Sequence, residues 1–252
     1  SVVDQTLQPC EIVLTVDGPI PQKLENVIEK YRNQLVDSKI DFKVLYLPQN
    51  VGHGEARRSS FNLCKNEFIA LMDADDISVS NRFESQMEYF AQHPELSVVG
   101  GNILEFIGKT QNGVGRRCVP EKDSEIKKYM QKRCPMNQVT VMFRKADVAR
   151  VGGYIDWYCE EDYYLWIRLA LAEYQFGNVQ QDLVYVRVGD EMYDRRGGWK
   201  YFKSEASLQA FMLKRHVITA GRFFVNVTER LILQVLMPNR LRGFIFQKFA
   251  RS

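Results

Sequence analysis

Cysteine and histidine are scarce in this sequence, with five and three residues among 252. The cysteines are odd in number, lie far apart and form no Cys-x-x-Cys pair, which argues against a disulfide framework and a zinc site. This cysteine usage favours a reducing compartment. The histidines show no metal-ligand spacing, and no Gly-x-x-x-x-Gly-Lys-Ser/Thr element is present, so a P-loop is excluded.

Long uncharged apolar runs are also missing, and the sequence therefore predicts no membrane-spanning helix. No charged-then-apolar leader opens the chain, so we expect no secretory signal and a cytoplasmic location. The formal net charge of +3 gives no reason to expect a nucleic-acid partner. With 45% hydrophobic and 26% charged residues, the composition is that of a globular protein. The length of 252 residues predicts one domain, or one domain with a C-terminal appendage.

Short apolar strands alternate with helices in the first half of the chain. β-Branched and apolar runs predict strands within 11–19, 42–48, 67–73 and 96–102. Apolar residues three and four apart predict helices at 21–36, 54–64 and 81–92. The alternation is typical of an α/β fold and predicts a mostly parallel central sheet with flanking helices. Ligands of such sheets bind beyond the carboxyl ends of the strands.

The second half of the chain has a different pattern. Positions 106–119 predict a basic, glycine-containing loop, and 137–145 predict a strand of mixed character. An aromatic and acidic stretch then leads into an apolar helix, and 182–190 predict one more strand. From about position 200 the chain is expected to be mostly helical.

Three carboxylates follow the predicted strand at 67–73, in the run Asp73-Ala74-Asp75-Asp76. Alternate carboxylates at a strand exit can bind a hard, oxygen-preferring cation such as Mg²⁺ or Mn²⁺, which usually keeps waters and binds substrate phosphates. The alternative is that the acids cap the following helix. Ser80 could provide that cap alone, which would leave the triple acid unexplained.

A second acidic run, Glu160-Glu161-Asp162, opens the helix DYYLWIRLAL. Acids in a first turn favour the helix dipole, which is a purely structural explanation. The aromatic setting of Trp157 and Tyr163 could instead raise the pKa of a carboxyl group towards that of a general base. The residues alone leave both interpretations open.

The stretch QNVGHGEARRSS at 49–60 is a glycine-punctuated turn that leads into a helix. Exposed N–H groups together with the guanidinium groups of Arg57 and Arg58 can bind an anion. A solvated loop with surface arginines is the alternative.

The C-terminal tail is basic and apolar at once. Positions 214–252 contain eight Lys or Arg residues against Glu229 alone, and Phe244, Phe246 and Phe249 lie near Lys248 and Arg251. A basic amphipathic segment suits an anionic membrane face, whereas a helix packed on the domain is the alternative.

In their order and spacing, these pieces resemble a family-2, GT-A type glycosyltransferase over nearly the whole chain. The matching stretches are SVVDQTLQPCEIVLTVDGP, NVGHGEARRSS, LMDADD and EEDYYLWIRL. The C-terminal part is similar to the bacterial exopolysaccharide, amylovoran-type subgroup. The resemblance implies a GT-A (Rossmann-like) fold, and it leads us to expect that the family's first strand is missing before Ser1.

The resemblance also implies roles on the donor side. Asp17 would bind the uracil ring of a nucleotide-sugar, and Arg57 would lie near the nucleotide. Asp73 would sit by the ribose or the metal. Asp75 would ligate Mn²⁺ or Mg²⁺ on the diphosphate.

On the acceptor side, Asp162 would be the catalytic base, supported by Glu161. The implied reaction is a single inverting displacement, in which an acceptor hydroxyl attacks the anomeric carbon as its proton passes to Asp162. Cys134 and Gln138 stand where the subgroup is expected to have Asn and His, and this departure touches the acceptor side.

Together these points predict a transferase that moves a hexose from a UDP-sugar to a lipid-linked saccharide in polysaccharide synthesis. We expect a transferase domain at 1–190 and a membrane-associating helical segment at 191–252, at the inner face of a bacterial membrane. Two alternatives are a nucleotidyltransferase and a truncated fold that acts as a non-catalytic scaffold.

Overall fold

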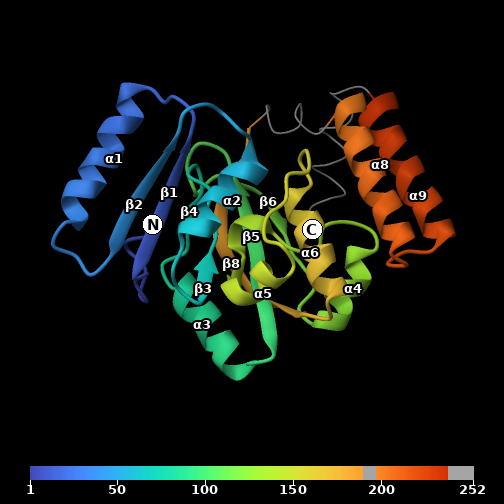
Figure 1. The fold of residues 1–252 in the computed structure, drawn as a ribbon, viewed down its shortest axis with the longest axis horizontal. Helices are drawn as coiled ribbons and strands as arrows, with labels where there is room; N and C mark the ends of the chain where they lie inside the picture. The colour runs from blue at the N-terminus through green and yellow to red at the C-terminus, as the bar shows by residue number, and fades with distance from the viewer. Residues whose placement is uncertain (190–196, 238–252) are drawn as a thin grey trace.

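The computed structural model describes residues 1–189 and 197–237 (Figure 1). At one end of the molecule, the parallel strands β1 (Glu11–Asp17) and β2 (Asp41–Leu47) form a sheet of their own, joined by helix α1 (Gln22–Leu35). The register runs from Glu11 opposite Asp41 to Asp17 opposite Leu47. This βαβ unit confirms the strand–helix–strand prediction for the start of the chain.

The larger sheet has the strand order β3-β7-β5-β8-β4, with β6 also paired to β5. Its strands are β3 (Phe68–Ala70), β4 (Ile77–Ser78), β5 (Leu96–Phe106), β6 (Gly113–Arg117), β7 (Met142–Arg144) and β8 (Gln175–Arg187). Only β5 and β8 pair in parallel, and the other pairs are antiparallel.

The α/β prediction is therefore confirmed, but the prediction of a mostly parallel sheet is wrong for this larger sheet. Strand–helix alternation indicates which elements form and does not fix their neighbours. The short strand β7, from the second half of the chain, inserts antiparallel between β3 and β5.

Two local predictions in the second half of the chain also need correction. Within the predicted loop at 106–119, β6 pairs with the long strand β5, and the register shifts at Glu105/Phe106. The residues of β6 are largely exposed, so they lack the alternation of buried positions that signals a strand. The predicted strand at 137–145 is a 3₁₀ turn, Gln138–Thr140, followed by β7.

Helices flank the sheets, and the sequence predicted those described below except the two short ones at 123–130 and 145–150. They are α2 (His53–Leu63), α3 (Arg82–Gln92), α4 (Asp123–Met130), α5 (Lys145–Arg150), α6 (Glu161–Leu171), α8 (Trp199–Lys214) and α9 (Ala220–Leu231), with a π-helical turn at Ile232–Leu236. Helices α8 and α9 form a hairpin at the end of the molecule opposite β1 and β2 (Figure 1).

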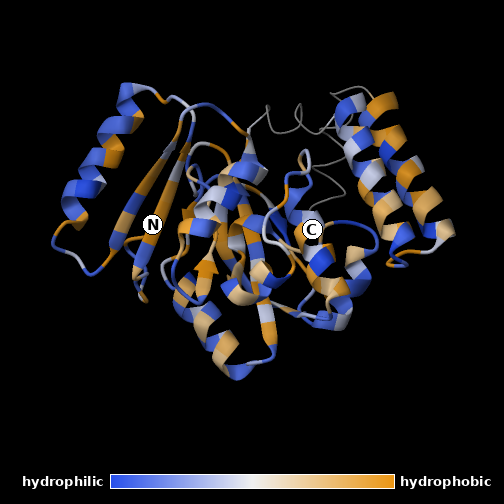
Figure 2. Ribbon diagram, in the orientation of Figure 1, coloured by the Kyte–Doolittle hydropathy of each residue, from blue (hydrophilic) through white to orange (hydrophobic). Residues whose placement is uncertain are grey.

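The main hydrophobic core surrounds α6. Leu165, Trp166 and Leu169 are fully buried there, and Leu208 and Met212 of α8 belong to the same cluster. Burying one such side chain contributes roughly 1.5–3 kcal/mol. Figure 2 shows hydrophobic residues along the strands, and hydrophobic residues that alternate with hydrophilic ones along the helices. The α8–α9 hairpin thus shares the core of the rest of the fold. The predicted domain boundary after 190 falls at residues outside the described part and stays a prediction.

Candidate active site

The Asp73–Asp76 loop follows β3 and is held on two sides by arginines. From α3, Arg82 donates from Nη2 to the carbonyl of Leu71 at 2.8 Å. From the end of β8, the main-chain N–H of Arg187 donates to Asp76 Oδ1 at 2.8 Å, and its Nε donates to the carbonyl of Asp75 at 3.3 Å. Strand β4 separates this loop from α3, so the acids do not cap the following helix, and that alternative is wrong.

Arg82 is a fully buried cation, and its desolvation lowers the pKa of its guanidinium to about 9. Its Nε donates to Gln86 Oε1 at 3.0 Å, while its Nη2 binds the Leu71 carbonyl. Burying a charge among neutral acceptors is costly unless its donors are satisfied. The side chain therefore fixes the start of the acidic loop against α3.

Arg57 of α2 connects the two acidic runs. Its Nη2 lies 3.2 Å from Asp73 Oδ1, and its Nη1 lies 2.5 Å from Glu161 Oε1. The Glu161 side chain is 8% exposed, and burial together with Asp162 raises the pKa of its carboxyl group, while Arg57 opposes that rise. Neighbouring Arg58 is a surface residue that pairs with Glu55 at 3.5 Å. The predicted anion site thus has one buried arginine already paired with carboxylates.

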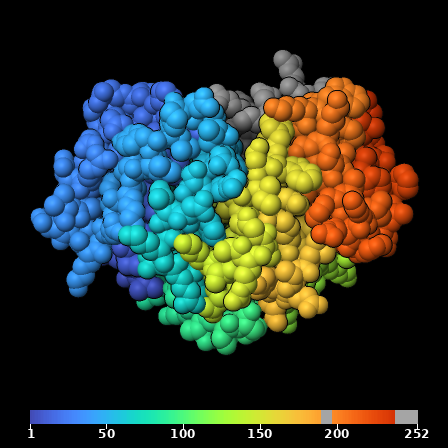
Figure 3. Space-filling view, in the orientation of Figure 1, coloured from blue at the N-terminus to red at the C-terminus, as the bar shows by residue number. Residues whose placement is uncertain are grey.

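The turn before α2 brings these elements into contact. Gly52 has φ +88°, which favours glycine, and a Cβ on Gly54 would lie 2.9 Å from Asp156 Oδ1 and 3.5 Å from Glu161 Cβ. Figure 3 shows the α2 region (cyan) side by side with the segment that precedes α6 (yellow). Glycine in this turn therefore allows α2 to approach the acidic start of α6.

Asp17, at the carboxyl end of β1, organises the same turn. Its Oδ1 accepts from the main-chain N–H of Val51 at 2.7 Å, and its Oδ2 accepts from that of Gly52 at 3.1 Å. Asp17 thus contacts the loop before α2 rather than the Arg57 cluster. The predicted uracil-binding role stays a prediction and would have to use the remaining lone pairs of this carboxylate.

The three acids at the start of α6 point to three different sets of partners. Glu161 faces Arg57, as described above. Asp162 accepts from its own helix, with Oδ1 2.6 Å from the N–H of Tyr163, and its Oδ2 lies 4.0 Å from Cys134 Sγ. Burial, with Glu205 and Asp162 nearby, raises the pKa of Glu160 well above its usual value. The hydrogen bond from the Tyr163 N–H supports the structural interpretation of this run, and the role of Asp162 as a general base stays a prediction.

The Asp73–Asp76 loop offers carboxylate oxygens, the ligands that Mg²⁺ and Mn²⁺ prefer. Asp75 is exposed, and Asp76 has its pKa raised to about 6 by burial, with Asp75 and Asp73 adding to the rise. Arg57 neutralises part of this charge through Asp73, and the exposed Asp75 carboxylate leaves oxygens that fit a cation. No group of three or more acidic, His or Cys ligands gathers within the described residues. A metal held by Asp75 and Asp73 would therefore need phosphates and water to complete its shell.

Several residues at this site had no role assigned from the sequence, although all but Tyr154 lie in stretches that the sequence analysis singled out. Asp76, Glu160, Cys134 and Tyr154 all lie in or against the acidic cluster, and Gln138 Nε2 donates to Tyr154 Oη at 3.1 Å. Asp76 and Glu160 are direct neighbours of predicted residues, so the acidic runs were a usable signal. The resemblance had already marked Cys134 as a departure on the acceptor side, whereas no local pattern marks Tyr154.

A family model for glycosyl transferase family 2 matches residues 1–152, more than half of the chain. The chain belongs to glycosyl transferase family 2. This family 2 member is also 39% identical to an uncharacterized glycosyltransferase of Haemophilus influenzae over 253 aligned positions, covering 100% of the chain and 91% of that protein.

Two further relatives of this glycosyltransferase have more specific names. The UDP-Gal:alpha-D-GlcNAc-diphosphoundecaprenol beta-1,3-galactosyltransferase of Escherichia coli is 32% identical, covering 100% of the chain and 89% of that protein. The amylovoran biosynthesis glycosyltransferase AmsE of Erwinia amylovora is also 32% identical, covering 98% and 90%.

Solved structures of low identity share the GT-A fold. Residues 1–349 of S. aureus TarS in complex with UDP superpose with a TM-score of 0.61 at 18% identity, covering 96% of this chain and 68% of that one. A mannosyltransferase from Pyrobaculum calidifontis with GDP-Man and Mn²⁺ superposes with a TM-score of 0.62 at 11% identity, covering 96% and 65%. Among the described helices of this family 2 enzyme, none is both long and apolar enough to span a membrane.

Proposed function

We propose that this enzyme transfers a hexose from a UDP-sugar to a lipid-linked saccharide, with inversion at the anomeric carbon. The observation that carries the proposal is the Arg57 bridge, which ties the Asp73–Asp76 loop to the acidic start of α6. In this proposal the donor phosphates bind at the Asp73–Asp76 loop and the general base lies at the start of α6. Arg57 links these two parts of the reaction centre. The relative named as a UDP-Gal transferase to a diphosphoundecaprenol-linked sugar supports the donor and acceptor classes.

The donor side is formed by β1, α2 and the acidic loop. In this proposal Asp17 binds the uracil ring and Arg57 lies near the nucleotide. Asp75, with Asp73, holds Mn²⁺ or Mg²⁺ together with the donor diphosphate. When bound, such an ion supplies neutralisation of the negative charge on the departing nucleoside diphosphate. The exposure of Asp75 leaves its carboxylate open to such a ligand.

The acceptor side is formed by the start of α6. The Asp162 carboxylate accepts the proton of an acceptor hydroxyl as that oxygen attacks the anomeric carbon from the face opposite the diphosphate. The new glycosidic C–O bond forms as the C–O bond to the diphosphate breaks, and UDP leaves with the electron pair. Glu161 supports Asp162 by tying the helix start to Arg57.

We also propose contact with an anionic membrane at the cytoplasmic face, where a lipid-linked acceptor would be reached. Helix α9 and the turn after it leave apolar side chains in solvent, including Phe224 at 67% and Leu236 at 66% exposure, with Val225 and Ile232 beside them in the exposed set. Figure 2 shows this outer apolar colouring on α9. The predicted tail residues Phe244, Phe246, Lys248, Phe249 and Arg251 lie outside the described residues.

Vesicle sedimentation tests the membrane contact. Deletion of Arg240–Ser252 should release the protein from vesicles that contain phosphatidylglycerol, and Phe224→Ser with Leu236→Ser should weaken binding further. Equal binding of all variants would contradict the contact.

Calorimetric titration with UDP-sugars, with and without Mn²⁺, tests the donor proposal. We expect metal-dependent binding of one sugar class and, with a diphosphoundecaprenol-linked acceptor, release of UDP. Release of pyrophosphate would instead identify a nucleotidyltransferase. Failure of every nucleotide-sugar to bind would contradict the proposal and leave the non-catalytic scaffold.

A further inference from the structure

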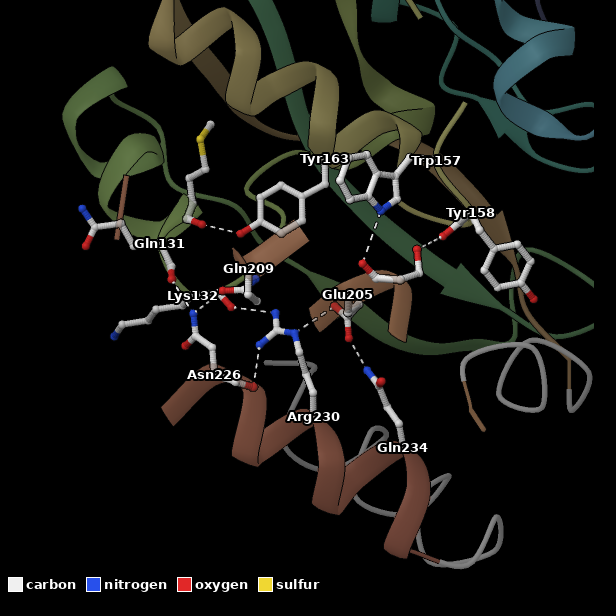
Figure 4. Close-up of polar contacts among 12 residues, drawn as sticks. Gln131, Lys132, Trp157, Tyr158, Tyr163, Glu205, Gln209, Asn226, Arg230 and Gln234 are labelled. Atoms are coloured by element: carbon white, nitrogen blue, oxygen red, sulfur yellow. Dashed lines mark hydrogen bonds and ion pairs between the residues drawn. The ribbon is translucent and has the colours of Figure 1, made fainter. Parts of the chain in front are cut away.

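The α8–α9 hairpin meets the acidic start of α6 through a buried polar network (Figure 4). At its centre lies Arg230 of α9, which is 8% exposed and whose Nε lies 3.1 Å from Glu205 Oε1 of α8. Gln234, in the π-helical turn, donates to the other oxygen of Glu205. The proposed reaction uses none of these residues directly, so the network calls for a separate explanation.

On one side, Arg230 reaches the loop that follows α4. Its Nη2 donates to the carbonyl of Lys132 at 3.0 Å, and Asn226 Nδ2 on the same helix donates to the carbonyl of Gln131 at 2.8 Å. Two residues further on, this loop reaches Cys134, whose Sγ lies 4.0 Å from Asp162 Oδ2. One wall beside the proposed base is thus attached to α9.

On the other side, the network reaches Glu160, the residue that opens α6. Tyr201 of α8 hydrogen-bonds the Glu160 carboxylate, and Arg230 lies near enough to oppose the rise in the pKa of Glu160 that burial and Glu205 cause. Within α6 itself, the hydroxyl of Tyr163 donates to the carbonyl of Met130, at the end of α4. Residues of α8 and α9 therefore contact both the residue that opens α6 and the loop at 131–134.

Helix α8 also fixes the turn that leads into α6. Trp157 Nε1 donates to the carbonyl of Ser204 at 3.3 Å, and Ser204 Oγ donates to the carbonyl of Tyr158 at 2.6 Å (Figure 4). The next residue, Cys159, has φ +58°, a conformation that a non-glycine residue keeps only when its surroundings impose it. The hairpin supplies those surroundings.

Stability alone does not account for a buried Arg–Glu pair at this place. Replacing such a pair by apolar residues of similar volume is often neutral or stabilising, because desolvation offsets the attraction between the charges. The same hairpin already packs Leu208 and Met212 into the core. A directional, charged contact that reaches the loop at 131–134 and the surroundings of Glu160 instead restricts the geometry of the two segments that flank Asp162.

We propose that the α8–α9 hairpin is a positioning element of the active site: Arg230 and Glu205 hold the turn at 157–162 and the loop at 131–134 around the Asp162 carboxylate. The inference rests on the proposed function in taking Asp162 as the base. Arg230 and Glu205 are positioning residues and do not touch the reacting groups.

Substitution of Arg230→Met in the full chain tests this assignment with two readouts. Hydrogen exchange measured by mass spectrometry should rise about tenfold or more at 130–136 and 157–164 and stay unchanged in β1, β2 and α3. In the transfer assay, kcat should fall roughly 10- to 100-fold, while the calorimetric Kd for UDP with Mn²⁺ changes less than about twofold. Arg230→Lys, which keeps the charge but not the fork of donors, should recover part of kcat.

Arg168→Met is the matched control, because Arg168 is likewise an arginine that donates to main-chain carbonyls, but from α6 to Val151 and Gly153, away from Asp162. It should leave kcat and the exchange at 130–136 unchanged. Glu205→Gln, which keeps the shape of the side chain, replaces Arg230→Met if that variant does not fold.

The inference is overturned if exchange rises only within α8 and α9, if kcat is unchanged, or if kcat and UDP affinity fall together. A wild-type chain without transfer activity would refute the proposed function, whereas the exchange readout would still decide whether the hairpin holds these two segments.

Discussion

The two halves of the candidate site are built differently. On the donor side, main-chain groups hold the acids: Asp17 binds the N–H groups of Val51 and Gly52, and the Asp75 carbonyl binds Arg187. On the base side, buried side chains hold one another, as in the pairing of Arg57 with Glu161. The donor side therefore leaves the exposed Asp75 carboxylate open to a ligand, while the base side is fixed before any ligand binds.

The substitution with the largest expected effect separates these two halves. Asp162→Asn removes the proposed base and should lower kcat by about 10²- to 10⁴-fold, since general-base catalysis contributes on that scale. UDP affinity in the presence of Mn²⁺ should stay unchanged, because the donor side is intact. Steady-state kinetics and calorimetry check this, with exposed Asp4→Asn as the control. A variant that keeps wild-type kcat would show that Asp162 is not the base.

Arg57→Met breaks the connection between the halves. Two carboxylates would lose their cation, so we expect kcat/KM to fall about 100-fold and the free energy of unfolding to fall by about 2 kcal/mol, less than for a fully buried pair. Arg58→Met is the matched control, because its pair with Glu55 is exposed and contributes little. Equal effects of the two substitutions, in urea denaturation and in transfer assays, would mean that the bridge has no special role.

Asp75→Asn tests whether the exposed Asp75 carboxylate on the donor side binds the metal ion. The variant should weaken Mn²⁺-dependent UDP binding about tenfold or more, since loss of even a residue that only supports a metal ligand typically costs roughly 10- to 100-fold in affinity. The unfolding temperature should stay the same because the side chain is exposed. Without Mn²⁺, the variant and the wild type should bind UDP alike. If Mn²⁺ promotes UDP binding equally in both proteins, Asp75 is not a metal ligand.

Glu160→Gln has the smallest expected effect and tests whether burial on the base side raises the pKa of the Glu160 carboxyl group. Burial raises the pKa of Glu160 above 4.5, with Glu205 and Asp162 adding to the rise and Arg230 and Tyr201 opposing it. The folded protein therefore holds a proton that the unfolded chain releases, so stability declines as pH rises above about 4.5 towards the folded-state pKa.

The glutamine variant lacks this slope and should be more stable than wild type at pH 8 by about 1 kcal/mol, but not at pH 5. Urea denaturation at both pH values measures the difference, with exposed Glu88→Gln as the control. A constant difference between variant and wild type at the two pH values would contradict a raised pKa.

The donor side could be predicted from the sequence because its signals are local. Short strands ending in acids place Asp17 and Asp73 at strand exits, and the glycine turn before α2 marks the position of Arg57. The base side depends on contacts between distant segments, as when Cys134 approaches Asp162 and Arg230 approaches Glu205. For the same reason, the antiparallel insertion of β7 next to β3 was not predicted.

The central claim is that the Asp73–Asp76 loop and the start of α6 serve one reaction centre. A crystal soaked with UDP and Mn²⁺, with anomalous diffraction recorded at the manganese edge, tests it most directly. The account predicts one manganese peak coordinated by the Asp75 carboxylate and the diphosphate, with the Asp162 carboxylate open to the same cleft. A peak bound elsewhere, or an Asp162 side chain walled off from the nucleotide, would contradict it.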